Sequence, residues 1–185
     1  MSAREARGGF TLRDTGLQRV VALFLVVIVA LALQSTLLVQ LTILRVIPQL
    51  VLVVVVSLAY SDGERFGVVA GFLGGLMQDL QQPGLPVGLY ALVYTLVGFG
   101  VGSFRQYVNS ESVWMPVLAV MISSAVAEGS YAVLAIMLGE RWISFQDTVV
   151  VAGLVVLYNT LLAPFVFPIV NRIAARYRPE RVHRL

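Results

Sequence analysis

The chain has 185 residues, of which 58% are hydrophobic and only 12% are charged, and its mean hydropathy is +0.87. A soluble globular domain carries about a quarter charged residues, so this composition excludes that class and predicts an integral membrane protein. The net charge is +3, all 13 basic residues are Arg, and cysteine is absent, which excludes disulfides, thiolate metal sites and thiol nucleophiles.

The N-terminal segment, residues 1–19, is polar and Arg-rich, and a long apolar run begins at Val20. Within that run, residues 30–32 (Ala-Leu-Ala) resemble the small-residue cleavage site of a signal peptide. The apolar run continues well beyond this point. We therefore predict a retained first helix over residues 20–41, which Gln34 interrupts near mid-depth.

The second predicted span, residues 47–60, is short. At about 1.5 Å per residue it covers roughly 21 Å, less than the roughly 30 Å hydrocarbon core of a bilayer. Its ends therefore lie in protein-lined surroundings, or the membrane is thinner around it. After a charged turn at residues 61–65, a third helix is predicted over residues 64–82 and a fourth over residues 87–107, joined by a Pro/Gly loop.

Glycines recur in steps of four on the third and fourth predicted helices. A step of four places them on one face of a helix, where a second helix can approach closely. We predict that this face packs helices together, either within the chain or against a partner, and we leave open whether the chain forms a homodimer. The glycines are Gly67, Gly71, Gly75, Gly98 and Gly102.

Two tyrosines, Tyr90 and Tyr94, share one face of the fourth predicted helix near one of its ends. We interpret them as part of an aromatic belt at the membrane interface, with the wall of a pocket as the alternative.

The last two predicted helices cover residues 112–138 and 146–175. The sixth contains Pro164 and Pro168, and each proline removes a backbone donor and frees a carbonyl one turn earlier. We therefore predict a bend in this helix. The domain organisation is thus an N-terminal segment, a six-helix transmembrane domain over residues 20–175, and a basic tail.

The distribution of Arg predicts the orientation. With six spans, both termini lie on one side of the membrane, and that side collects 11 of the 13 Arg residues. Basic residues favour the cytoplasmic side, so we predict a multi-pass protein of the bacterial inner membrane with both termini in the cytoplasm. The basic tail, residues 176–185, then meets anionic lipid headgroups, and we expect no nucleic acid partner.

Four polar residues lie within predicted spans. Gln34, Glu128 and Asn159 fall at similar depth, roughly 20 Å from a helix end, and are predicted to meet inside the bundle. We expect Glu128 to be protonated and hydrogen-bonded to one of the other two, because an unpaired carboxylate there costs several kcal/mol. Such a group holds helices together or forms part of a ligand or ion site. Asp79 either caps the turn before the Pro/Gly loop or has a binding role.

Catalytic chemistry is thinly supported. The only histidine, His183, lies in the basic tail, so the spans contain no His-based catalytic or zinc site. Asp79 and Glu128 could in principle form an intramembrane aspartyl-type catalytic pair, but no pattern places them together. A chain without Lys has no phosphate-binding loop of the G-x4-G-K type. We predict a non-enzymatic protein with no catalytic residues, no cofactor and no metal site.

One stretch, residues 71–102, resembles a known family. It reads GFLGGLMQDLQQPGLPVGLYALVYTLVGFGVG and is similar to the signature of the bacterial rod shape-determining MreD family, G-x-x-x-G-L-x-x-D followed by G-L-x-A-L-x-Y-x-L-x-G. Pro48 before a Leu/Val run, and Tyr158 through Pro168, resemble two further family segments. Gln49 stands where an acid is common in the family. The matching positions are Gly71, Gly75, Leu76, Asp79, Gly88, Leu89, Ala91, Leu92, Tyr94, Leu96 and Gly98.

The resemblance implies a scaffold of the cell-wall elongation complex that supports peptidoglycan synthesis and rod shape. It implies binding to the bitopic protein MreC and work alongside MreB, RodA and a class B penicillin-binding protein. It also implies an all-α six-helix bundle similar to the substrate-binding component of energy-coupling-factor transporters. That likeness supplies an alternative function, a small-molecule-binding transporter component in which Glu128, Asn159 and Tyr94 line a pocket.

Overall fold

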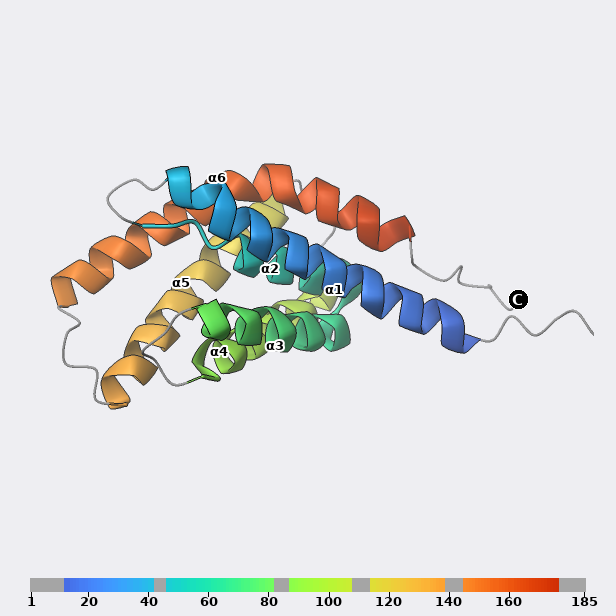
Figure 1. Cartoon of the computed structure of the whole chain (residues 1–185), viewed down its shortest axis with the longest axis horizontal. Helices are drawn as coiled ribbons and strands as arrows, with labels where there is room; N and C mark the ends of the chain where they lie inside the picture. The colour runs from blue at the N-terminus through green and yellow to red at the C-terminus, as the bar shows by residue number, and fades with distance from the viewer. Residues whose placement is uncertain (1–11, 42–45, 82–86, 108–113, 139–144, 177–185) are drawn as a thin grey trace, which may run out of the picture.

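The described part of the chain is built from six α-helices and two short 3-10 helices (Figure 1). The computed structural model describes residues 12–41, 46–81, 87–107, 114–138 and 145–176. The predicted all-α membrane protein is confirmed, and each predicted helix is present. The elements are α1 (Leu12–Thr36), η1 (Leu38–Leu41), α2 (Leu50–Asp62), α3 (Glu64–Gln81), α4 (Leu89–Phe104), η2 (Arg105–Tyr107), α5 (Trp114–Met137) and α6 (Phe145–Arg176).

Two stretches of the described chain, α5 and residues Thr148–Arg176 of α6, are long and apolar enough to cross a membrane. Shorter apolar stretches occur in α1, α2 and α4. The helix α1 begins at Leu12, eight residues before the predicted start, and runs without a break through residues 30–32. The rest of the N-terminal segment, the Pro/Gly loop over residues 82–86 and the basic tail after Arg176 lie outside the described residues.

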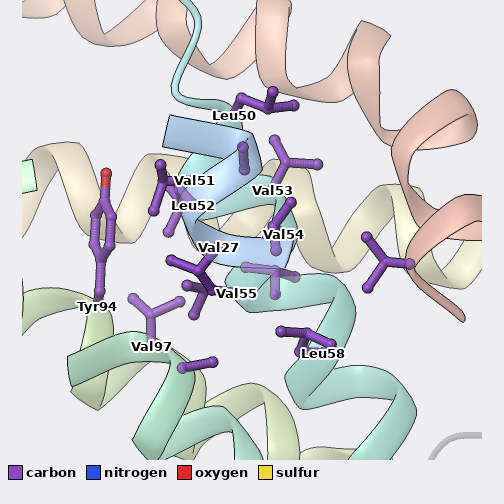
Figure 2. Close-up of a cluster of buried hydrophobic side chains, with 14 of the residues drawn as sticks. Val27, Leu50, Val51, Leu52, Val53, Val54, Val55, Leu58, Tyr94 and Val97 are labelled. Carbon is purple, nitrogen blue, oxygen red and sulfur yellow. The ribbon is translucent and has the colours of Figure 1, made fainter. Parts of the chain in front are cut away.

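The centre of the bundle is α2, which contacts each of the other α-helices. Its residues from Leu50 to Ala59 are all buried, and Val51, Val53 and Val55 are fully so. A helix that is apolar on every side is typical of a position surrounded by protein. Figure 2 shows this valine-rich helix passing through the cluster of buried side chains. The short span is therefore accommodated by protein around it, the first of the two alternatives.

Glycines bring α3 and α4 into backbone contact along their length. A Cβ atom on Gly67 would overlap the backbone of Gly98, one on Gly71 would overlap the carbonyl of Tyr94, and one on Gly75 would overlap that of Tyr90. At the other end of the pair, Gly102 lies against the backbone of α3 in the same way. All five glycines of the predicted packing face are buried between these two helices, so this face is used inside the chain.

The turn between α2 and α3 is a single residue, Gly63, rather than the predicted charged turn over residues 61–65. Gly63 has φ +90°, and its N–H donates to the carbonyl of Ala59 at 2.9 Å. Only glycine adopts this backbone conformation without strain, so one residue reverses the chain and both helices extend into the expected turn.

Pro164 and Pro168 lie inside α6, which continues through both. The bend expected at these residues stays a prediction. Figure 1 places the start of α1 and the end of α6 on the same side of the molecule. The predicted six spans would have this consequence, and the number of membrane passes stays a prediction.

Gly71→Leu tests the close contact of α3 with α4. The new side chain meets the backbone of α4, which cannot move aside as a flexible side chain can, so we expect destabilisation by about 1–3 kcal/mol or more. Thermal unfolding in detergent, followed by size-exclusion chromatography, measures it. Gly153→Leu on α6 is the matched control, because a Cβ there meets no atom within 4 Å. Equal melting of the two variants would contradict the packing described.

Candidate functional site

The N-terminus of α2 is buried and is capped from two other helices. Gln49, the residue before α2, makes no side-chain cap of its own. Its backbone N–H donates to Oδ1 of Asn159 on α6 at 3.0 Å, and the N–H of Val51 donates to Oε1 of Gln34 on α1 at 3.1 Å. The first turn of a helix leaves N–H groups without partners, and leaving them unpaired in an apolar interior costs free energy. Two predicted polar residues, Gln34 and Asn159, meet this need.

The side chain of Gln49 joins three helices. Its Nε2 donates to Oε1 of Glu128 on α5 at 2.5 Å, and its Oε1 accepts from the hydroxyl of Tyr94 on α4 at 3.1 Å. In Figure 2 the hydroxyl of Tyr94 points toward the level at which α2 begins. On the other side, Nδ2 of Asn159 donates to Oγ of Ser124 on α5 at 3.0 Å. Glu128 and Asn159 are thus linked through Gln49, which the sequence analysis did not include among the buried polar groups.

Gln34 lies in a second branch of the network. Its Nε2 donates to Oε1 of Gln78 on α3 at 3.0 Å, while its Oε1 accepts from α2. Gln34 bonds Gln78 and the backbone of α2, whereas Glu128 bonds Gln49, so the predicted meeting of three residues is better described as two branches on either side of the start of α2. The predicted partner of Glu128 is corrected from Gln34 or Asn159 to Gln49.

Asp79, at the end of α3, caps the start of α4. Its Oδ2 accepts from the N–H groups of Gly88 and Ala91 at 2.9 and 3.0 Å, and its Oδ1 accepts from that of Tyr90 at 2.9 Å. A carboxylate at a helix N-terminus also interacts favourably with the helix dipole. Gly88 has φ +114°, which a glycine adopts at low cost and which leads the chain into α4. Asp79 therefore caps the helix after the Pro/Gly loop, not the turn before it.

A polar cavity of about 540 Å³ lies among the ends of α1 and α3, the starts of α2 and α4, the middle of α5 and the first half of α6. Of the predicted pocket residues, Glu128 lines it together with Gln34, whereas Tyr94 and Asn159 do not line it and instead support Gln49, which does. The complete lining is Gln34, Ser35, Val46, Ile47, Gln49, Gln78, Gln81, Tyr90, Glu128, Tyr131, Val151 and Val155.

The aromatic-belt interpretation of Tyr90 and Tyr94 is wrong. Tyr94 is 0% exposed and Tyr90 is 6% exposed, and their rings contact each other edge-to-face. Tyr90 also stacks on Tyr131 of α5, with ring centroids 4.3 Å apart. Tyr90 lines the polar cavity, which agrees with the alternative interpretation of these tyrosines as the wall of a pocket. Periodicity placed both tyrosines on one face but could not show that this face points inward.

A second, apolar groove of about 550 Å³ lies between α4 and α5. Several of the side chains along it are more than half exposed, including Leu96, Phe104, Ile122 and Val126. Small residues lie between them, and Gly100 has no atom within 4 Å of a built Cβ. The groove is lined by Tyr60, Val93, Leu96, Val97, Gly100, Val101, Phe104, Arg105, Met115, Leu118, Ala119, Ile122, Ser123, Val126 and Ser130.

Together these features define an all-helical membrane protein with a polar centre, a polar cavity at one end and an apolar groove on one face. No group of three or more potential metal-binding side chains occurs among the described residues. A family model described as rod shape-determining protein MreD matches residues 15–174, and the chain belongs to this family. Membership supports a role in determining rod shape. Searches of curated proteins and of solved structures gave no match, so the expected likeness to energy-coupling-factor components stays a prediction.

Asn159→Ala tests the cap on α2. The variant leaves the buried N–H of Gln49 and the hydroxyl of Ser124 without this partner, and we expect a loss of about 1–3 kcal/mol of stability. Thr160→Ala is the control, because the Thr160 hydroxyl bonds only back to Val156 of its own helix. Thermal unfolding compares the two, and a smaller effect for Asn159→Ala would contradict the capping role.

Asp79→Asn tests the cap on α4. An amide can keep only one acceptor oxygen, so its NH2 group faces at least one backbone N–H that the carboxylate accepted, and we expect a loss of about 1–3 kcal/mol. Glu64→Gln, at the exposed start of α3, removes the same charge without this conflict. Hydrogen exchange at residues 88–91 provides the readout. Unchanged protection of these amides in Asp79→Asn would rule the cap out.

Proposed function

We propose that this protein is a non-enzymatic scaffold of the bacterial cell-wall elongation complex and that it binds MreC. The family match, over most of the chain, carries the proposal. The described structure supports it with a surface suited to a partner in the membrane, the apolar groove between α4 and α5.

The proposed location is the inner membrane, with several passes and both termini in the cytoplasm. The start of α1 and the end of α6 lie on the same side of the molecule, as this orientation requires (Figure 1). With six spans, 11 of the 13 Arg residues of the sequence would belong to that side, and Arg favours the cytoplasmic face. The basic C-terminal tail then faces anionic lipid headgroups.

The groove between α4 and α5 is the proposed docking surface for the single transmembrane helix of MreC. Between lipid-exposed helices there is little hydrophobic driving force, so association depends on close packing at small residues. The groove supplies Gly100, Ala119, Ser123 and Ser130 among larger apolar side chains. The five glycines of the predicted packing face are instead packed between α3 and α4 and leave no such surface.

The remaining partners follow from the family rather than from a particular surface. MreB, RodA and a class B penicillin-binding protein are proposed to join the same complex. Because the groove is assigned to MreC, a homodimer would need a different surface.

Gly100→Trp tests the docking surface. The new side chain enters the groove rather than the core, since a Cβ at Gly100 meets nothing within 4 Å, and replacing glycine by Trp favours the helix by a few tenths of a kcal/mol. We expect the variant to fold and to lose co-purification with tagged MreC from membranes.

Gly153→Trp is the matched control, because Gly153 is equally open but lies on α6 outside the groove. We expect it to retain MreC. Binding of MreC by a folded Gly100→Trp variant at the level of the control would reject the groove as the docking surface.

A second candidate function, binding of a small molecule, is favoured by one observation: the polar cavity lined by Glu128 and several glutamines.

A further inference from the structure

The polar cavity is not used by the scaffold function, and it has the size of a ligand site. Its volume of about 540 Å³ lies within the roughly 300–1,000 Å³ that is common for small-molecule sites. It lies at the end of the bundle away from the start of α1 and the end of α6. It is also separate from the apolar groove, because the residues that line the two do not overlap.

The hydrogen-bonding groups of the cavity include both donors and acceptors. Glu128 accepts one bond from Gln49 at Oε1 and keeps further acceptor capacity on its carboxyl group. Gln78 uses its Oε1 for Gln34 and offers an NH2 group with two donors. Gln49 spends one N–H on Glu128 and retains the other. A ligand that matches them must itself both donate and accept, as hydroxyl groups do.

These polar groups are held in place by the rest of the structure. Gln49 is fixed at its backbone by Asn159 and at its side-chain oxygen by Tyr94. Gln78 is fixed through Gln34, which is itself bonded to α2. Preorganised polar groups lose little side-chain entropy when a ligand binds.

The charge and the aromatic surface of the cavity narrow the ligand class. Among the described residues that line it, Glu128 is the only carboxylic acid and none is Arg or His, so an anionic ligand would meet no counter-charge. A simple cation would use the acceptors and leave the amide donors unpaired. Tyr90 and Tyr131 are stacked with ring centroids 4.3 Å apart, and Tyr90 is buried whereas Tyr131 is partly exposed, so the aromatic surface left to a ligand belongs mainly to Tyr131. The negative face of an aromatic ring suits the polarised C–H groups of a saturated ring.

From these features we infer that the cavity binds an uncharged sugar ring, either free or as the head group of a membrane amphiphile. The vicinal hydroxyls pair with Glu128, Gln78 and Gln49, and the C–H face of the ring lies on Tyr131. This site is independent of the proposed MreC contact and concerns a different surface.

The absence of cysteine from the chain allows a direct test. Ser35→Cys places a single thiol on the wall of the cavity, and the native hydroxyl bonds only to its own helix, so the change is mild. The rate of modification by N-ethylmaleimide is measured on the full chain in nanodiscs. The probes are the methyl and octyl β-glycosides of glucose and galactose, with octyl tetraethylene glycol ether as the amphiphile without a sugar.

We expect a glycoside to slow modification by about ten-fold when its concentration is about ten times its dissociation constant, by mass action. Protection by the methyl glycosides supports a free sugar, and protection by the octyl glycosides alone supports a membrane-borne head group. Thr36→Cys, on the next residue and outside the cavity lining, should show no protection. Equal protection by the ether, protection at Thr36→Cys, or no protection by any glycoside would overturn the inference.

Glu128→Gln in the Ser35→Cys background tests the assigned contact. An amide oxygen can still accept from Gln49, but the NH2 group replaces the second carboxyl oxygen and cannot accept from a ligand hydroxyl, so we expect about ten-fold weaker protection. Glu64→Gln, near the other end of the bundle, is the matched control and should leave protection unchanged. An unchanged dissociation constant in a folded Glu128→Gln variant would remove Glu128 from the site and contradict the assignment.

Discussion

The start of α2 is the constraint on which much of this structure depends. A helix surrounded by other helices buries its N-terminus, yet its first N–H groups still need acceptors. Here the acceptors come from Gln34 on α1 and Asn159 on α6, so the first and last helices are tied to the centre at the same place. A short apolar helix can therefore begin inside the membrane domain.

The start of α4 is also capped by a side chain of a neighbouring helix, and here glycines bring the two helices together. Gly67 faces Gly98, Gly71 faces Tyr94, and Gly75 faces Tyr90, so each step of four residues along α3 matches a step of four back along α4. One further step along α3 brings Asp79 to the start of α4, where it caps three N–H groups. The glycines and the aspartate are thus parts of one antiparallel arrangement, in which small residues set the distance and the carboxylate fixes the end.

Much of the fold could be predicted because each helix carries a local signal. Apolar length, glycine spacing and the Pro/Gly breaks predicted the number of helices and most of their boundaries. One exception is the start of α1, which lies eight residues before the predicted one. Another is the α2–α3 turn, where a charged stretch was interpreted as a loop, whereas Gly63 alone reverses the chain. The site was harder. Depth along a helix correctly selected Gln34, Glu128 and Asn159 as buried or partly buried groups. Depth does not show in which direction around the helix axis a side chain points.

The remaining errors concern which side of a helix faces the interior, because the sequence does not show how a helix is rotated about its axis. Tyr94 and Tyr90 lie near a helix start, where an interfacial belt is plausible from sequence, yet their face is turned inward by the glycine contact with α3. Gln49 precedes α2, and the sequence analysis considered it only because an acid is common at this position in the family. The structure makes it the residue that connects Glu128, Tyr94 and Asn159, because an uncharged amide both donates and accepts where a carboxylate could only accept.

On α4 and α5 the residues of the groove lie next to residues of the polar centre, and this limits which substitutions can disturb partner binding alone. On α4, Val93 lines the groove and the next residue, Tyr94, bonds Gln49. On α5, Ser123 lines the groove and Ser124 bonds Asn159. A bulky change at Val93 or Ser123 would rotate or shift its helix and disturb the network as well. Gly100 lies nearly two turns beyond Tyr94 in open space, so a side chain there fills the groove without reaching the polar centre. Loss of a partner in that variant therefore reports on the groove itself.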